Sequence, residues 1–149
     1  MRAVVQRVGE ASVTVGNVEV GRIDRGLLVY LGVAAEDGPE DADALAGKIR
    51  CLRIFPDDTG RMNLDIKQVK GSVLVVSNFT LCADTRRGRR PAFTGAAEPR
   101  VAETLVARVC ERLRDGGVGV QTGRFGESML VRSTNDGPIN LTLDTRETR

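Results

Sequence analysis

The sequence of 149 residues contains no histidine and no tryptophan. Without histidine, the Ser-His-Asp and Cys-His arrangements of many hydrolases are excluded, and so is the commonest metal ligand. Any hydrolysis by this chain must take its base from a carboxylate, a lysine, a water network or the substrate itself. The lack of histidine is therefore a strong restriction on mechanism.

Cysteine is also scarce. Cys51, Cys82 and Cys110 are an odd number, lie far apart and form no C-x-x-C pair, which argues against a disulfide framework and a zinc site and favours free thiols. No apolar run approaches the roughly 20 residues of a membrane-spanning helix, and the start of the sequence has no signal-peptide pattern. The sequence predicts a cytoplasmic protein without metal or membrane contact.

The periodicity of the apolar residues indicates strands and two helices. Acidic residues follow Pro39 in the first turn of a helix predicted over 39–50, where the helix dipole favours them. A second helix is predicted over 98–115, because apolar residues recur there at helical spacing before a Gly-Gly pair. Alternating or continuous apolar segments predict strands over residues 3–8, 11–15, 17–23, 26–33, 72–81, 118–125, 127–133 and 139–145.

These elements predict the class of fold. Strands dominate and the two helices lie far apart, so we expect an α+β protein with a mostly antiparallel, barrel-like sheet and two main helices. Gly16-Asn17 is predicted to be a tight turn between two strands. The length predicts a single domain over residues 1–149.

Arginine is abundant, although the net charge is only +2. There are 19 arginines against 3 lysines, and four arginines fall in the stretch RRGRR, residues 86–90. Their planar guanidinium groups suit bidentate phosphate contacts, whereas a merely solvated face is the alternative. Aromatic residues are few, so recognition of single-stranded RNA by base stacking is poorly supported and contact with the phosphate backbone is favoured.

The stretch SNFTLCADT, residues 77–85, carries an apolar strand into a polar loop. Backbone N–H groups at such a strand end can stabilise an oxyanion. The hydroxyls of Ser77 and Thr80 are conceivable nucleophiles, but each would need an activating base, and Asp84 is a weak one. A plain strand-to-loop transition is the alternative interpretation.

The stretch NDGP, residues 135–138, precedes an alternating segment. Since proline adds no N–H to a sheet, a turn before the strand over 139–145 is the plain interpretation. Gly137 also presents an unshielded carbonyl, and a Gly-Pro bond adopts the cis form at modest cost. Fixed carbonyl oxygens of this kind can sort substrates by the position of an amino group, and both interpretations stay open.

Several stretches, taken together and in order, resemble the D-aminoacyl-tRNA deacylases over nearly the whole chain. The resemblance implies a homodimeric, cytosolic ester hydrolase that removes D-amino acids mischarged onto tRNA, clears glycine mischarged onto tRNA-Ala, and needs no metal or organic cofactor. The stretches are MRAVVQRVGEASVTV, GLLVYLGV, RIFPDDTGRMNLDI, GSVLVVSNFTLCADTRRGRRPAF, QTGRFGESM and NDGPINLTLDT.

The resemblance implies roles for residues at the strand end. The backbone amides of Phe79 and Thr80 match the family's oxyanion hole, and Ser77 and Asn78 belong to the same catalytic stretch. The terminal 2′-OH of the tRNA, or a water that it positions, is implied as the activating group, which fits a chain without histidine. Met129 matches a position that lines the substrate pocket.

The resemblance also implies how substrate is held. Gly137 and Pro138 match an element that reaches into the partner subunit's pocket, where its carbonyls hold the amino group of a D-amino acid and exclude an L side chain. Arg7 matches an arginine that locks this element. By their charge, the candidates to meet the acceptor stem of tRNA are Arg86, Arg87, Arg89 and Arg90.

Two positions depart from the family pattern. Asn78 stands where the family has glutamine, which shortens its reach by about 1.5 Å, and Asn140 stands where the family has threonine. These departures leave an alternative, a tRNA-binding module of the same fold without catalysis. Another alternative is a related editing deacylase with a trans Gly-Pro bond and relaxed specificity, since the sequence does not determine the isomer.

Overall fold

The computed structural model describes residues 1–86 and 88–147. Both helices begin and end within a residue of their predicted limits. In chain order the elements are β1 (Arg2–Val15), β2 (Val18–Ile23), β3 (Gly26–Gly32), α1 (Pro39–Cys51), β4 (Phe55–Pro56), β5 (Met62–Leu64), β6 (Ser72–Ser77), the 3₁₀ helix η1 (Phe79–Cys82), α2 (Pro99–Asp115), β7 (Gly119–Thr122) and β8 (Leu130–Asp144).

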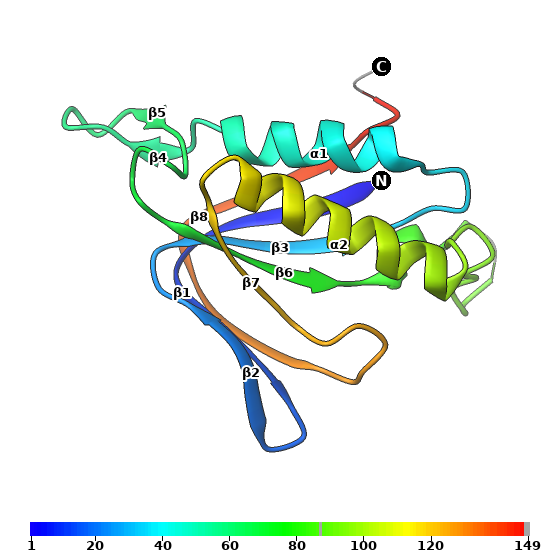
Figure 1. The fold of residues 1–149 in the computed structure, drawn as a ribbon. Coiled ribbons are helices and arrows are strands. Elements are labelled where there is room, and N and C mark those ends of the chain that lie inside the picture. Colours follow the sequence, from blue (N-terminus) through cyan, green and yellow to red (C-terminus); the bar gives the residue numbers. More distant parts are fainter. Residues whose placement is uncertain (87, 148–149) are drawn as a thin grey trace.

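Strand β1 lies between β8 on one edge and β3 and β2 on the other (Figure 1). It pairs antiparallel with β3 over Arg2–Val8 and with β2 over Ala11–Val15, while β8 follows it along nearly its whole length. Strand β3 then pairs with β6, and β6 with β7, in parallel. The sheet predicted to be mostly antiparallel is therefore mixed.

The connections explain the parallel pairs. Helix α1 lies between β3 and β6 in the chain, and α2 lies between β6 and β7; a crossover through a helix brings the chain back to start the next strand in the same direction. At the far side, β2 approaches β7 so closely that a Cβ on Gly21 would lie 2.6 Å from the carbonyl oxygen of Thr122. This approach nearly closes the sheet into a barrel.

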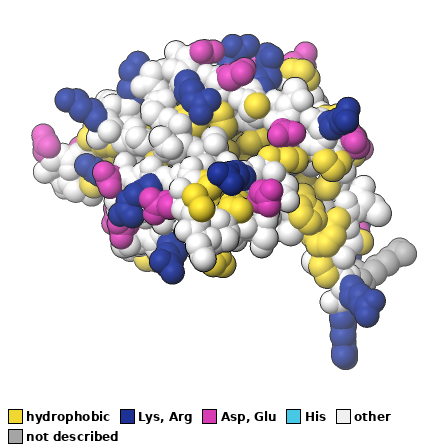
Figure 2. Space-filling model, turned by 60° about the horizontal axis from the view of Figure 1, so that its bottom comes forward, with side chains coloured by type: hydrophobic (Ala, Val, Ile, Leu, Met, Phe, Trp, Pro, Cys, Tyr) yellow, Lys and Arg dark blue, Asp and Glu magenta, His cyan; other side chains and the backbone are white. Residues whose placement is uncertain are grey.

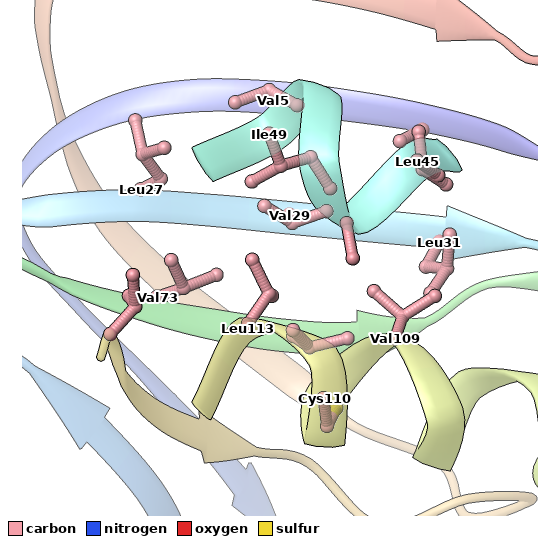
Figure 3. Close-up of a cluster of buried hydrophobic side chains, with 14 of the residues drawn as sticks. Val5, Leu27, Val29, Leu31, Leu45, Ile49, Val73, Val109, Cys110 and Leu113 are labelled. Carbon is pink, nitrogen blue, oxygen red and sulfur yellow. The ribbon is translucent and has the colours of Figure 1, made fainter. Parts of the chain in front are cut away.

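The main hydrophobic core lies between the sheet and the two helices, which cover the same face (Figures 1 and 3). Leu27, Val29 and Leu31 point from β3 toward the helices, as expected for alternate residues of a strand. Leu113 of α2 is completely buried among them. Each such side chain contributes roughly 1.5–3 kcal/mol to the stability of the fold.

A second, smaller core fills the concave side of the sheet. Leu28 of β3 and Leu74 and Val76 of β6 pack there against Val8 and Val13 of β1. Because β3 and β6 pack against a core on each face, both of their faces are apolar. Their sequences are therefore continuous apolar runs rather than alternating ones.

The helices α1 and α2 are also joined by charge. Asp43 of α1 accepts hydrogen bonds from Arg108 at 2.7 Å and from Arg112 at 2.9 Å. The hydrogen bonds from Arg108 and then from Arg112 lower the pKa of Asp43 to about 2. Its carboxylate therefore stays ionised near neutral pH.

Two pairs of predicted strands are each a single strand in the structure, β1 and β8. The segments 3–8 and 11–15 form one strand, and the segments 127–133 and 139–145 merge into β8. The two strands pair across register shifts next to Val8, and such bulges absorb residues that do not fit a regular ladder. Of the two interpretations left open for NDGP, the turn is therefore wrong, because Gly137-Pro138 lies inside β8.

Two other predicted strands are shorter in the structure. The strand predicted over 72–81 ends at Ser77, where η1 follows, and the strand predicted over 118–125 is limited to Gly119–Thr122. The turn at Gly16-Asn17 joins β1 to β2 as predicted. No helix in the described part of the chain is long and apolar enough to cross a membrane.

Candidate active site

A cavity of about 610 Å³ opens where β6 ends. One wall is formed by the strand end from Val76 to Phe79, another by α2 with Val106, and a third by the loop from Phe125 to Met129. The lining is mainly apolar, and its polar side chains come from Tyr30, Ser77, Asn78 and Glu127. An apolar cleft with a few placed polar groups is the usual form of a small-molecule site.

The strand end has a defined local structure. The Asn78 N–H donates to the carbonyl of Leu31 at 2.8 Å, which fixes the end of β6 to β3. The side-chain oxygen of Asn78 accepts hydrogen bonds from the Thr80 N–H, at 3.2 Å, and from the Thr80 hydroxyl. An asparagine that binds the backbone in this way competes with the strand ladder, and this is why the predicted strand stops at Ser77.

The two backbone amides at the strand end differ. The Thr80 N–H is engaged with the side chain of Asn78, whereas the Phe79 N–H makes no hydrogen bond with any residue that the structure describes. The Phe79 ring is 59% exposed and contacts Phe93 edge to face, with 5.0 Å between ring centroids. Both rings line the cavity.

The hydroxyl groups of the strand end have no adjacent base. The Thr80 hydroxyl donates to an amide oxygen, and within the described residues the Ser77 hydroxyl makes no hydrogen bond with a carboxylate or a lysine. Asp84 is held by Arg86 through two side-chain hydrogen bonds at 2.9 and 2.7 Å. These bonds keep the pKa of Asp84 well below its usual range, so Asp84 is a poor proton acceptor.

The arginine-rich segment projects beside the cavity. Asp84 and Ala92 exchange backbone hydrogen bonds at 2.7 and 2.9 Å and close the loop between them. Arg86 is tied to Asp84, whereas Arg89 and Arg90 are exposed and form no ion pair with a described residue. Arg87, the fourth predicted tRNA contact, lies outside the described residues. Figure 2 shows hydrophobic side chains in a band that leads to a projecting segment with basic side chains.

Gly137 and Pro138 form a separate group with Arg7. The Gly137-Pro138 bond is cis, and both residues are exposed. Arg7 is only 8% exposed; it donates to the carbonyl of Ile54 at 2.7 Å and pairs with Asp136 at 3.0 Å. Gly137 has φ +125°, a conformation that favours glycine.

Asn135 fastens this segment from the other side. Its side-chain amide donates to the carbonyl of Arg7 at 3.0 Å and to the carbonyl of Ile139 at 3.2 Å. The exposed pair between them is therefore anchored at both ends. Asn135 and Asp136 were not predicted from the sequence to have a role, although short polar side chains next to Gly-Pro are a known signal for local backbone bonding.

The predicted site residues thus fall into two groups within one chain. Ser77, Asn78, Phe79 and Met129 line the cavity, and Thr80 adjoins it, whereas Gly137 and Pro138 do not. In the sheet, Arg7 is opposite Leu27 and Ser77 is opposite Leu31. Four residues of extended strand separate these rows by about 13 Å.

The cavity also contains residues that the sequence analysis missed. Tyr30, Phe125 and Glu127 line it, and burial raises the pKa of Tyr30. Tyr30 lies in an apolar run and Phe125 in a glycine-rich stretch, so neither carried a signal of its own. Within residues 1–86 and 88–147, no group of three or more His, Cys, Asp and Glu side chains is placed to hold a metal ion.

The family model described as D-Tyr-tRNA(Tyr) deacylase matches residues 4–144. The chain belongs to this family. Two similar proteins named D-aminoacyl-tRNA deacylase come from Syntrophobacter fumaroxidans, 53% identical over 147 residues, and from Thermotoga petrophila, 52% identical over 145 residues. The first alignment covers 99% of both chains and the second covers 97% of both. The predictions of this family and of an enzyme of the deacylase class are confirmed.

Two solved structures have the same fold as this chain. The structure of a protein named c-Myc DNA Unwinding Element Binding Protein is similar with a TM-score of 0.90 and 36% identity, over 97% of this chain and 98% of that one. A probable eukaryotic D-amino acid tRNA deacylase shares the fold, with a TM-score of 0.79 and 19% identity over 95% of this chain and 97% of that one. The predicted α+β class with a barrel-like sheet is confirmed, in its mixed form.

Proposed function

We propose that this chain hydrolyses the ester that joins a D-amino acid to the terminal adenosine of tRNA. The observation that carries the proposal is the cavity at the end of β6, bordered by the strand-end amides, in a chain about half identical to D-aminoacyl-tRNA deacylases over nearly its full length. The volume of about 610 Å³ suits an aminoacyl group with its adenosine.

In the proposed hydrolysis, the catalytic groups are backbone N–H groups of the chain and the 2′-OH of the substrate. A water adds to the ester carbonyl, the tetrahedral oxyanion collapses, and the bond to the ribose oxygen breaks, releasing the free amino acid and tRNA. The Phe79 N–H, which has no partner among the described residues, donates to the developing charge, and the Thr80 N–H does so in exchange for its bond to the Asn78 side chain. Since no base adjoins Ser77 or Thr80, the terminal 2′-OH of the tRNA positions or activates the water.

Selection of the D form is assigned to Gly137 and Pro138. They are exposed and anchored by Arg7 and Asn135, but they do not line the cavity of their own chain. A homodimer in which each Gly137-Pro138 enters the partner's cavity accounts for both features. Its carbonyls would then hold the substrate amino group and exclude an L side chain, while glycine on tRNA-Ala would pass.

The tRNA itself is held by phosphate contacts. Arg89 and Arg90 are exposed beside the cavity mouth and are free of ion pairs with described residues, so they offer guanidinium groups to the acceptor stem. Arg86 is already engaged with Asp84 and instead stabilises the loop.

The test is deacylation of one tRNA charged with D-tyrosine or L-tyrosine, and of glycyl-tRNA, by the wild-type chain and by Pro138→Ala. Pro56→Ala is the control, since Pro56 is exposed on β4 and does not line the cavity at the end of β6. We expect cleavage of the D form and of glycine, with L spared, and a loss of rate or of discrimination in Pro138→Ala alone. Binding without cleavage would instead indicate a tRNA-binding module, and cleavage of both tyrosine forms an editing deacylase of relaxed specificity.

A further inference from the structure

The helix η1 lies directly on the end of β3. A Cβ on Gly32 would be 2.9 Å from the Cβ of Leu81 and 3.0 Å from the carbonyl oxygen of Asn78, so a side chain at this position would displace η1. In the sheet, Gly32 is directly opposite Arg2 of β1. Opposite residues of an antiparallel pair project from the same face of the sheet, and the Arg2 side chain therefore lies beside η1.

The guanidinium group of Arg2 bonds to η1 and to β8 at the same time. Its Nη1 donates to the carbonyl of Leu81 at 3.1 Å, and its Nε donates to the carboxylate of Asp144 at 3.0 Å. Asp144 is directly opposite Arg2 in β8. Since the N–H groups of a guanidinium group lie in one rigid plane, the bond to Asp144 also fixes the direction in which Nη1 points.

The helix η1 has little support of its own. It is a 3₁₀ helix of four residues, a type with poorer hydrogen-bond geometry than an α-helix, and its Leu81 N–H donates to the carbonyl of Asn78 at 3.3 Å, a long hydrogen bond. The sheet holds the segment at its start, where the Asn78 N–H donates to Leu31, and near its end, where Leu81 accepts from Arg2. Loss of the second bond would leave η1 free to pivot about Asn78.

The position of η1 matters for the reaction, because it carries the N–H groups of Phe79 and Thr80. A displacement of about 1 Å in a group that must meet the reacting atoms can lower a rate by about 100-fold. Arg2 does not line the cavity. Any effect of Arg2 on hydrolysis must therefore pass through η1 and not through contact with the substrate.

We propose that Arg2 is a positioning residue for the hydrolysis. By holding the Leu81 carbonyl, it keeps η1 in place on Gly32 and so presents the N–H groups of Phe79 and Thr80 to the ester with little reorganisation. The proposal rests on the function proposed above and adds to that site a residue of β1 outside the cavity.

The competing interpretation is that Arg2 only joins β1 to β8 through its ion pair with Asp144. Arg2→Met keeps the aliphatic stem but removes both the ion pair and the bond to Leu81, whereas Asp144→Asn removes the charge of the ion pair and leaves the bond to Leu81 in place. Arg22→Met is the matched control, because Arg22 of β2 pairs with Glu10 of β1 at 2.9 Å and neither residue lines the cavity.

Single-turnover rates and KM are measured on D-tyrosyl-tRNA, stability by urea unfolding, and local opening by hydrogen–deuterium exchange of the backbone amides. We expect Arg2→Met to lower kcat by about tenfold to 100-fold and to leave KM within about threefold of wild type. The amides of η1 should exchange about tenfold faster in this variant, while those of β6 exchange as in wild type. Asp144→Asn and Arg22→Met should keep kcat within about threefold of wild type.

The inference is overturned if Arg2→Met keeps the wild-type kcat, if exchange in η1 is unchanged, if Asp144→Asn loses as much kcat as Arg2→Met, or if the loss of kcat follows a fall in the urea midpoint. In each of these cases the wild-type chain still cleaves the substrate, so the proposed function stands. A wild-type chain that binds D-tyrosyl-tRNA without cleaving it overturns the proposed function and this inference with it.

Discussion

Replacement of Gly137 by alanine tests whether the exposed Gly-Pro segment has the backbone conformation described here. Gly137 has φ +125°, and a Cβ on it would lie 2.6 Å from Cγ1 and 2.9 Å from the backbone nitrogen of Ile139. The backbone nitrogen belongs to β8 and cannot move away on its own. Alanine must therefore either displace the strand or abandon this conformation.

The cost has two parts. A residue other than glycine in a sparsely populated backbone region costs about 1–3 kcal/mol, and forcing extra atoms into a packed site costs about another 1–3 kcal/mol. We expect Gly137→Ala to lose about 2–6 kcal/mol of unfolding free energy. Its deacylation rate should fall as well, since Pro138 shifts with it.

The assay is urea unfolding at one protein concentration, with two glycine variants as controls. Gly60 has φ +79° but open space around it, so Gly60→Ala should show only the backbone cost of about 1–2 kcal/mol. Gly47 lies inside α1, also in open space, and alanine there should stabilise the chain by about 0.5–1 kcal/mol. Unfolding of Gly137→Ala at the same urea concentration as Gly60→Ala would contradict a steric clash at Gly137.

Two further predictions concern charge. The pKa of Asp43 is lowered by the arginines of α2 to about 2; because it lies below the unfolded value, the stabilisation is present above about pH 4 and is lost as pH falls toward about 2. Asp43→Asn should therefore be less stable than wild type at about pH 7, and urea unfolding at about pH 2.5 should show a much smaller difference. Arg89→Gln should weaken tRNA binding and reduce the slope of log K against log salt by nearly one unit. Arg86→Gln should change that slope less, since Asp84 already neutralises Arg86; equal slopes for the two variants would contradict the assignment.

The helices were the most predictable elements. The acidic first turn after Pro39 and the glycines after Asp115 are local signals, and local backbone preferences decide where a helix begins and ends. Even so, Val101, which shares the helical spacing of the buried residues of α2, is 46% exposed. Spacing indicates which face is apolar, but the length of the contact with the sheet decides how much of that face is covered.

The strands were predictable in position and less so in pairing. The chain order of strand, helix and strand from β3 to β7 contained the signal for parallel pairs, but the abundance of strands favoured an antiparallel interpretation. The bulges in β1 and β8 carry no local signal, because a bulge exists only relative to a partner strand. For the same reason, a turn at NDGP stayed open as one of two interpretations of the sequence, although NDGP lies inside β8.

The sequence by itself determined the chemistry that is available: no histidine, arginines gathered at 86–90, an apolar strand ending in SNFTL, and a resemblance that the family match confirms. Only the tertiary structure decided which of these groups meet. Asn135 bonds to Arg7, 128 positions away, and Gly137-Pro138 lies outside the cavity of its own chain. Contacts of this kind depend on strand register and on the closure of the whole sheet, and neither is encoded in the residues next to them.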